Sequence, residues 1–294
     1  MTPRIAFITL LAAAAVGSSN PLPAQSASDQ IGGCPSDSAR FHPCALAKAQ
    51  TFNPPRTPDG HPDLQGLWDA PTVPGGQSLE EHPGAYGFSP TRSKIVDPPD
   101  GKIPYQPWAA AQRRENEDQY IDPYAFCVPT GVPRQMYNAG YRQIVQRPEA
   151  VTILSERVHL FRVIHMDDRP HPGAGVMLVM GNSRGRWEGD TLVVDVTNLN
   201  GKVWYDLRGH FQSDALHVVE RLTLIERNTI HYQATIEDPR LYTRPWTIAL
   251  PLRRNLEYNE IWEEACYEGI SGTSTISNLR DVGYKVYTGI RPSK

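Results

Sequence analysis

The chain has 294 residues, of which 39% are hydrophobic and 21% are charged, and its 29 Lys and Arg residues nearly balance its 32 Asp and Glu residues. A formal net charge of -3 offers no basic surface of the kind that nucleic acid or an anionic membrane attracts, so neither partner is expected. A chain of this length can form one main domain with a sizeable core.

Residues 1–28 have the pattern of a secretory signal peptide. A single positive charge at Arg4 precedes an apolar run from Ile5 to Val16, which is followed by Gly, Ser and Pro residues and by a small residue at Ala24. The run is too short to span a bilayer as a mature anchor, and no later segment approaches the roughly 18 apolar residues that a transmembrane helix needs. No cysteine stands at the expected cleavage site, so a lipid anchor is not indicated. The sequence therefore predicts export to the periplasm or to the medium.

The four cysteines predict a disulfide framework. They are Cys34, Cys44, Cys127 and Cys266. An even number of cysteines in an oxidising compartment favours two disulfides over free thiols. We favour Cys34–Cys44, which closes a short loop, and Cys127–Cys266, which ties an early segment to a late one. Zinc is not expected, because no CxxC or CxxH spacing is present.

Residues 29–137 are predicted to form a Pro/Gly-rich arm with one strand and one helix. Up to residue 104 proline and glycine are frequent, as in NPPRTPDGHPD and DPPDGKIP, and no sustained period is present. Within this stretch only residues 64–70, LQGLWDA, have the pattern of a strand start. A helix is expected over Pro107–Tyr120, because proline suits a first helical position and AAAQRRENED consists largely of good helix formers. The arm is expected to lie over the main domain or to be partly mobile.

Residues 138–294 are dominated by a period of two, which is typical of half-buried strands. The segments with this pattern are YRQIVQ, AVTILSER, HLFRVIHM, RGRW, TLVVDVTN, LHVVERLTLIE, TIHYQATIED, PWTIALPLR, EYNEIWEEACYE and VGYKVYT. Short connectors such as WEGD and ERNT indicate hairpins between sequence neighbours. The predicted fold class is mainly β, an antiparallel up-and-down, lipocalin-like barrel or a strongly curved sheet, with a two-sheet sandwich as second choice.

The strand faces indicate an apolar and aromatic interior with a few charges. Glu220 is the single carboxylate on a face shared with Leu216, Val218, Leu222 and Leu224. A buried carboxylate must be paired or neutralised. The same alternation turns Tyr232 inward on the next strand, and it places Tyr258, Glu260, Trp262, Glu264 and Cys266 on one face. Such an interior suits a pocket for a mainly apolar or phenolic molecule with one or two polar handles.

Longer motifs carry a resemblance that covers most of the mature chain. They are PDLQGLWD, CVPTGVPRQM, GNSRGRWEGDTLVVDVTNLN, HVVERLTLI, ATIEDPRLYTRPW and EEACYEG. In these motifs the chain resembles a family of uncharacterised secreted bacterial proteins. The resemblance implies export and a single β domain, and it implies no particular activity, cofactor or catalytic residue. The GxW motifs at Gly66–Trp68 and Gly185–Trp187 are also similar to the strand start of lipocalins.

The densest group of polar residues is RVIHMDDRPHPGAG, residues 162–175, where a strand ends in a Pro/Gly-rich loop. Histidine exchanges protons near neutral pH, and a neighbouring carboxylate can fix its tautomer. We therefore assign His165 or His171 as the acid/base, Asp167 as the orienting carboxylate, and Arg169 as a clamp for a substrate carboxylate or oxyanion. The alternative is a solvated turn in which Asp caps the backbone and pairs with Arg, and the two interpretations have equal weight.

A second candidate group is Arg184, Arg186, Glu220 and Arg221, which hairpins could bring side by side. Glu220 could be a general base activated by burial, although a structural pair with an arginine is favoured. The candidate substrate-binding residues are Arg169, Arg186, Trp187, Trp204, Tyr232, Trp262 and Glu264, although a role in the core is favoured over a stacking platform for Trp187, Trp204, Tyr232 and Trp262.

Three further residues are candidate members of a site. GNSRG, residues 181–185, fits GxSxG, but a nucleophile elbow needs a helix after the serine, and here WEGDTLVV continues as a hairpin, so Ser183 is disfavoured as a nucleophile. His210 and His217 could complete the site. No metal-ligand spacing and no GxGxxG motif is present, so no cofactor is predicted.

Two function classes remain. The first is an exported, cofactor-independent enzyme that performs isomerase, lyase or hydrolase chemistry by proton transfer, with His165, Asp167, His171 and Glu220 as catalytic residues. The second is a non-catalytic, lipocalin-like carrier of a small molecule. A third possibility, in which the arm serves as an assembly device, would show as oligomerisation lost on deletion of residues 29–104. The oligomeric state itself is left open.

Overall fold

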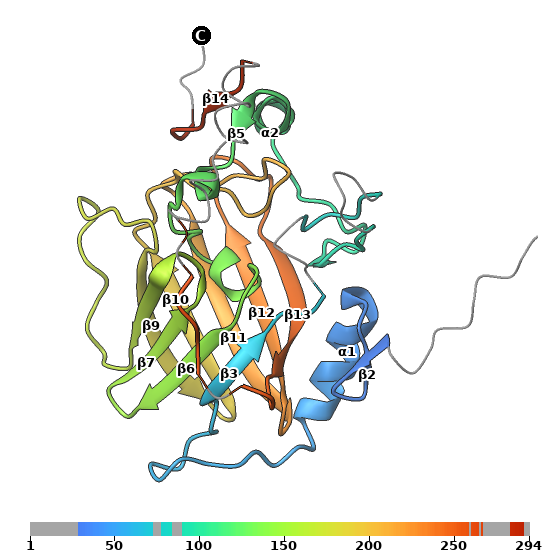
Figure 1. Cartoon of the computed structure of the whole chain (residues 1–294), viewed down its shortest axis with the longest axis vertical. Helices are drawn as coiled ribbons and strands as arrows, with labels where there is room; N and C mark the ends of the chain where they lie inside the picture. The colour runs from blue at the N-terminus through green and yellow to red at the C-terminus, as the bar shows by residue number, and fades with distance from the viewer. Residues whose placement is uncertain are drawn as a thin grey trace, which may run out of the picture.

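A computed structural model describes residues 29–72, 78–83, 90–258, 260–264, 266 and 283–290. The predicted signal peptide lies outside this part. The described chain is mainly β and forms a closed barrel of nine strands (Figure 1). The strands of the ring are β3 (Gly66–Asp69), β6 (Arg142–Arg147), β7 (Ala150–Ser155), β8 (Leu160–His165), β9 (Asn182–Glu188), β10 (Thr191–Thr197), β11 (His217–Glu226), β12 (Thr229–Glu237) and β13 (Trp246–Arg254). The ring closes because β13 pairs with β12 on one edge and with β3 on the other. The expected barrel is confirmed.

Short elements surround the barrel. β4 (Ile95–Asp97) pairs with the part of β13 that precedes its contact with β3. Outside the ring, β1 (Gln30–Ile31) pairs with β2 (Cys34–Pro35), and β5 (Tyr120–Ile121) pairs with β14 (Lys285–Val286). Three 3-10 turns, η3 (Pro123–Phe126), η4 (Arg134–Met136) and η5 (Arg157–His159), lie in the connections. No helix of the described residues is long and apolar enough to cross a membrane.

One strand pair departs from the expected up-and-down order. β8 and β9 run parallel, with Ile164 opposite Ser183 and His165 opposite Arg184, whereas the other pairs of the ring are antiparallel. A parallel pair needs a crossover of a dozen residues or more. Residues 166–181 form this crossover, which returns along the outside of the barrel on the left of Figure 1.

The barrel interior is filled by side chains rather than by a ligand chamber. Inward-facing apolar side chains from every part of the ring are at most 2% exposed, among them Trp68, Ile144, Ile153, Ile164, Leu192, Val194, Leu222 and Leu250. A barrel of about eight strands either fills its interior with side chains or holds one small ligand, and the near-complete burial of these apolar side chains indicates the first arrangement. The interior is therefore mainly the hydrophobic core.

A charged pair spans this core. Arg162 on β8 and Glu220 on β11 are 4% and 1% exposed, and both terminal guanidinium nitrogens donate to the carboxylate. Tyr232 donates its hydroxyl to Glu220 over 2.6 Å, and Arg162 Nε donates to Ser183 Oγ over 2.9 Å. Because β9 and β10 lie between β8 and β11 in the ring, this network links two strands that do not pair with each other.

The sequence interpretation missed the first helix. α1 (Ser38–Ala49) packs on the outer face of β11, β12 and β13, where Phe41 and Ala45 contact Ile225. Pro43 inside the helix and the proline-rich surroundings concealed it. The Cys34–Cys44 disulfide ties α1 to β2, and Asp37 caps its first turn by accepting from Arg40 N.

The second helix is confirmed. α2 (Pro107–Gln119) begins with proline, as predicted, and lies over one end of the barrel beside β5 (Figure 1). Asn116 Nδ2 donates to Gly209 O over 3.1 Å, so the helix is fixed to the connection between β10 and β11. Gly209 has a φ of 76°, and a Cβ there would overlap the backbone of Arg113 and Glu117.

The second disulfide is also confirmed, but the strand expected near it is not. Cys127 and Cys266 are bonded, so both predicted pairings hold. The described residues of 257–268 form no strand. The ring is already closed by β13, so this segment has no free edge with which to pair, and it crosses β3 and β6 on the outside instead (Figure 1). Asn255 N donates to Leu67 O, and Trp262 N donates to Glu156.

Replacing Glu220 should destabilise the barrel strongly. Glu220→Ala leaves the Arg162 charge buried without a partner, which costs about 3–5 kcal/mol of unfolding free energy. Urea denaturation measures this loss. Glu149→Ala, in an exposed turn, should change stability by less than about 0.5 kcal/mol. The double variant Arg162→Met/Glu220→Met should recover most of the loss, and a loss as large as that of Glu220→Ala would show that packing rather than charge is responsible.

The contact between α1 and the barrel should weaken in acid. His42 Nδ1 lies 3.0 Å from His231 Nε2, and burial lowers the pKa of His231 to about 3. The unfolded chain binds protons near pH 6.5 and the folded chain does not, so stability is complete above that pH and falls as the pH drops toward 3. We expect a loss of roughly 3 kcal/mol between pH 7.5 and pH 4.

His231→Gln should remove most of this pH dependence, as measured by urea denaturation at the two pH values. His159→Gln, at a solvent-exposed histidine, should leave the dependence as it is. An unchanged slope in His231→Gln would show that other groups account for the acid sensitivity.

Candidate functional site

The sheet separates the predicted catalytic residues. Glu220 points into the barrel, where it pairs with Arg162 rather than with Arg184, Arg186 or Arg221. His165 and Asp167 lie on the outer side of β8 and at its end, and His171 lies on the crossover. The structure therefore does not bring Glu220 together with these three residues.

The outer face of β9, β10, β11 and β12 carries a row of polar side chains at one end. Strand register places Arg184 opposite Asp195, and Asn182 and His217 each stand diagonally from Asp195 on the two flanking strands. Diagonal neighbours lie within reach of long side chains. Glu237 on β12 lies opposite His217 and ends the row.

The crossover adds a histidine to this row. His171 Nε2 lies 2.8 Å from Asp195 Oδ1, and His217 Nε2 lies 3.0 Å from Asp195 Oδ2, so one carboxylate bridges two imidazoles. His171 Nδ1 lies 2.8 Å from Asn182 Oδ1. We call His171, Asp195 and His217 the histidine–aspartate cluster.

Hydrogen bonds from the barrel fix the crossover in place. Arg184 donates to Asp167 over 3.1 Å and to Pro170 O over 3.1 Å. Asn198, just after β10, donates its amide to backbone oxygens of the crossover, including Val176 O at 2.8 Å. Asp167 also accepts from Arg169. Asp167, predicted to be the orienting carboxylate, therefore helps to hold the crossover that carries His171. Arg169 pairs with Asp167 and remains largely exposed.

The cluster favours a charged histidine. The hydrogen bond to Asp195 raises the pKa of His217, with burial acting against it. The hydrogen bond from His217 in turn lowers the pKa of Asp195. The three side chains are between 25% and 35% exposed, so a small molecule can reach them.

This geometry gives the two ring nitrogens of His217 different tasks. Asp195 holds Nε2 over 3.0 Å, while Nδ1 makes a longer ion pair of 3.6 Å with Glu237, which also raises the pKa of His217. A histidine with one nitrogen fixed by a carboxylate and the other in a looser contact that a ligand can displace can transfer a proton. Among the described residues, no group of three or more His, Cys, Asp or Glu side chains is arranged to hold a metal ion.

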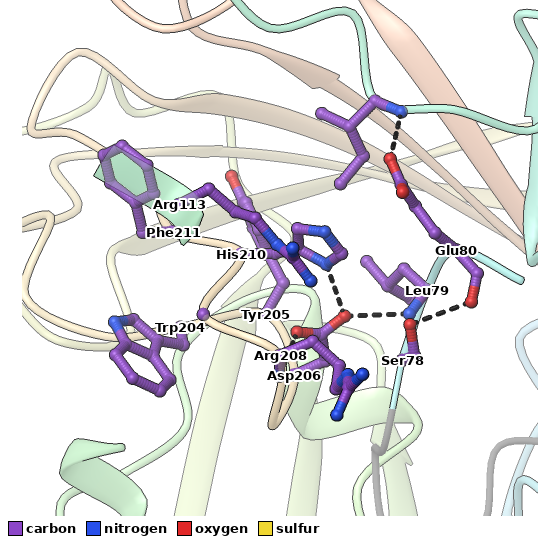
Figure 2. Close-up of polar contacts among 12 residues, drawn as sticks. Ser78, Leu79, Glu80, Arg113, Trp204, Tyr205, Asp206, Arg208, His210 and Phe211 are labelled. Carbon is purple, nitrogen blue, oxygen red and sulfur yellow. Dashed lines mark hydrogen bonds and ion pairs between the residues drawn. The ribbon is translucent and has the colours of Figure 1, made fainter. Parts of the chain in front are cut away.

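A second histidine–carboxylate pair is buried in the connection between β10 and β11. Figure 2 shows Asp206 accepting from His210 Nδ1 and from Leu79 N, over 2.7 and 2.8 Å. Burial would raise the pKa of Asp206, but His210 and the backbone N–H groups of Leu79 and Arg208 lower it below its usual value. Asp206 and His210 are 0% and 1% exposed, so the pair serves to join the segment around Leu79 to the end of the barrel.

The other predicted residues are dispersed. Trp204 and Tyr232 belong to the core, and Ser183 lies buried beside Arg162, far from the geometry of a nucleophile elbow. Arg186 is exposed and pairs with Glu188, and Trp187 stacks on His61 with ring centroids 4.9 Å apart. Trp187 is partly buried and packs against the core, so these residues lie in the core, at its edge and on the surface rather than around one site.

Trp262 and Glu264 line a surface cavity of about 430 Å³. It lies between the segment that follows β13 and the ends of β6 and β7, where Tyr141 and Arg157 form the opposite wall. Glu264 pairs with Arg157 and accepts from Val158 N over 3.1 Å. The face predicted to carry Tyr258, Glu260, Trp262 and Glu264 thus lines one cavity, although no strand forms it.

Sequence reasoning missed Asp195 and Asn182. Asp195 interrupts the apolar run TLVVDVT at an outward position, which was the available signal. Its partners depend on the register of three strands and on the path of the crossover, and neither can be read from a single segment.

Comparison with known protein families finds no match, and comparison with curated protein sequences finds none either. The function must therefore be argued from the site itself.

The cluster should stabilise the fold only within a limited pH range. The contribution of protonated His217 is complete below pH 6.5 and is lost as the pH rises through its raised pKa. The contribution of Asp195 is complete above its usual value of 3.8 and is lost as the pH falls through its lowered pKa. His217→Gln should therefore cost about 1 kcal/mol at pH 5.5 and much less at pH 9, as measured by urea denaturation.

Asp195→Asn should show the same pH dependence, and the double variant should lose little more than either single variant. An equal loss at pH 5.5 and pH 9 would contradict an ionic contribution.

Proposed function

We propose that this chain is an exported enzyme that performs cofactor-independent acid/base chemistry on a small, mainly apolar or phenolic molecule. The histidine–aspartate cluster is its site. His217 transfers the proton through Nδ1, Asp195 orients it, and His171 stabilises the charge on Asp195. The reaction class is an isomerisation, an elimination or a hydrolysis. Two disulfides fit the oxidising surroundings of the periplasm or the medium.

The observation that carries the proposal is the carboxylate shared by two partly exposed histidines. A purely structural pair, such as Asp206 and His210, is closed off from solvent, whereas His171, Asp195 and His217 remain accessible. Proton transfer by a positioned side chain contributes about 100- to 10,000-fold to a reaction rate. An oriented histidine with a raised pKa can supply that effect near neutral pH.

The surroundings of the cluster suit an apolar substrate. Val176, Met177 and Leu178 on the crossover are between 38% and 43% exposed, and the crossover is fixed to Asn198 at the end of β10. These side chains offer an apolar surface close to the strand that carries Asp195. Arg169 on the same crossover supplies a cation for a polar handle of the substrate.

The carrier remains the second candidate, and the cavity beside Trp262 favours it. A lipocalin-like carrier holds its ligand inside the barrel, but here the inward side chains fill that space. A carrier of this fold would bind its ligand at the surface cavity instead.

The test begins with thermal unfolding of the oxidised protein against phenolic, terpenoid and glycoside compounds, since a ligand of the native state raises the melting temperature. Each stabilising compound is then incubated with the wild type, His217→Gln and Asp195→Asn, and its consumption is followed by mass spectrometry. We expect turnover by the wild type and a loss of about 100-fold or more in both variants. Glu149→Gln, in an exposed turn, should turn over normally.

Two outcomes would contradict the proposal. A compound consumed equally by the wild type and by His217→Gln would place the chemistry elsewhere. A compound that stabilises the protein and stays intact would favour the carrier.

A further inference from the structure

The surface cavity beside the segment that follows β13 has walls of an unusual composition. Its volume of about 430 Å³ falls within the range of small-molecule sites. Three aromatic rings and four carboxylates line it, against a single guanidinium. The lining aromatic and charged residues are Tyr141, Tyr258, Trp262, Glu156, Glu260, Glu263, Glu264 and Arg157.

The three rings meet at steep angles. The centroids of Tyr141 and Tyr258 are 6.1 Å apart with an interplanar angle of 56°, and those of Tyr258 and Trp262 are 6.1 Å apart at 70°. Trp262 is 65% exposed and Tyr258 is 42% exposed, although both are large aromatic side chains. Rings inclined in this way can present their faces to one bound group, and ring faces carry negative charge density that attracts cations.

Two of the four carboxylates are bound to neighbouring residues of the cavity, and the other two are not. Glu156 accepts from Tyr141 N over 2.8 Å and from Trp262 N over 3.2 Å, so it holds two ring-bearing residues in place. Glu264 is paired with Arg157, which is the cation of the cavity. Glu260 has no ion-pair or hydrogen-bond partner within the described part of the chain, and Glu263 approaches only His159, at 3.8 Å. Among the described residues, the lining of the cavity therefore carries more carboxylates than cations.

The phenol of Tyr141 responds to this environment. Burial raises its pKa most, and the carboxylates of Asp69 and Glu156 act in the same direction. These two carboxylates therefore add negative potential around the rings.

We propose that this cavity binds a small organic cation, a quaternary ammonium or protonated amine, whose charged head lies among Tyr141, Tyr258 and Trp262. Glu260 and Glu263 provide the complementary charge. A neutral molecule of the same shape would lack both the attraction to the ring faces and the attraction to the carboxylates. An anion would be repelled by them. The site is separate from the histidine–aspartate cluster and does not depend on the proposed enzyme activity.

The test compares choline with 3,3-dimethyl-1-butanol, which has the same shape without the charge. Isothermal titration calorimetry on the full oxidised chain should give choline a dissociation constant in the roughly millimolar range or tighter, and the neutral alcohol should bind at least about tenfold more weakly. Trp262→Ala should weaken choline binding about tenfold or more. Glu260→Gln should weaken it several-fold and reduce its dependence on salt.

Matched controls separate the site from general effects. Trp108→Ala removes another exposed tryptophan, on α2, and should leave choline binding unchanged. His217→Gln should also leave it unchanged, so a failure of the proposed enzyme activity would not affect this result. Circular dichroism and the melting temperature of Trp262→Ala, with Tyr258→Leu as a second variant, show that the fold is retained.

Either of two results overturns the proposal. Equal binding of choline and 3,3-dimethyl-1-butanol would assign the cavity to neutral molecules. No saturable choline binding up to about 50 mM would show that the rings and carboxylates do not form a cation site.

Discussion

A closed ring of nine strands cannot reverse direction at every step, because an odd number forces at least one pair of neighbours to run the same way. In this protein the pair is β8 and β9, and the crossover of residues 166–181 follows from it. Gly185 accommodates the pair, since a Cβ there would overlap Ile164 and Met166. The crossover carries His171 onto the outer face, so the requirement that closes the barrel also completes the histidine–aspartate cluster.

The barrel uses ion pairs differently on its two sides. Arg162 and Glu220 are buried inside, and there they link two strands of the ring that are not neighbours. Asp195 and His217 form an equivalent contact on the outside, where about a third of each side chain remains exposed. The outer pair combines a titratable histidine with exposure to solvent, so it can exchange protons with a ligand, whereas the inner pair only supports the fold.

The sequence predicted what depends on local pattern. Alternating apolar residues predicted the strands, Pro107 marked the start of α2, and the cysteine count led to both disulfides. α1 was missed because its stability comes from packing on the barrel and from the Cys34–Cys44 bond, which outweigh Pro43. Arg162 was missed as the partner of Glu220 because the two strands are distant in the ring, and Asp195 was missed because strand register decides its neighbours.

Both proposed sites arise where an irregular segment lies against fixed strands. For the cluster, β10 and β11 supply Asp195 and His217, and Arg184 and Asn198 hold the crossover over them. For the cavity, the start of β6 supplies one wall, while the Cys127–Cys266 bond and Glu156 hold the segment that follows β13. Different residues hold the two irregular segments in place, and none of the contacts named here belongs to both sites. The two sites can therefore change independently, because altering the segment that forms one leaves the strands and anchors of the other in place.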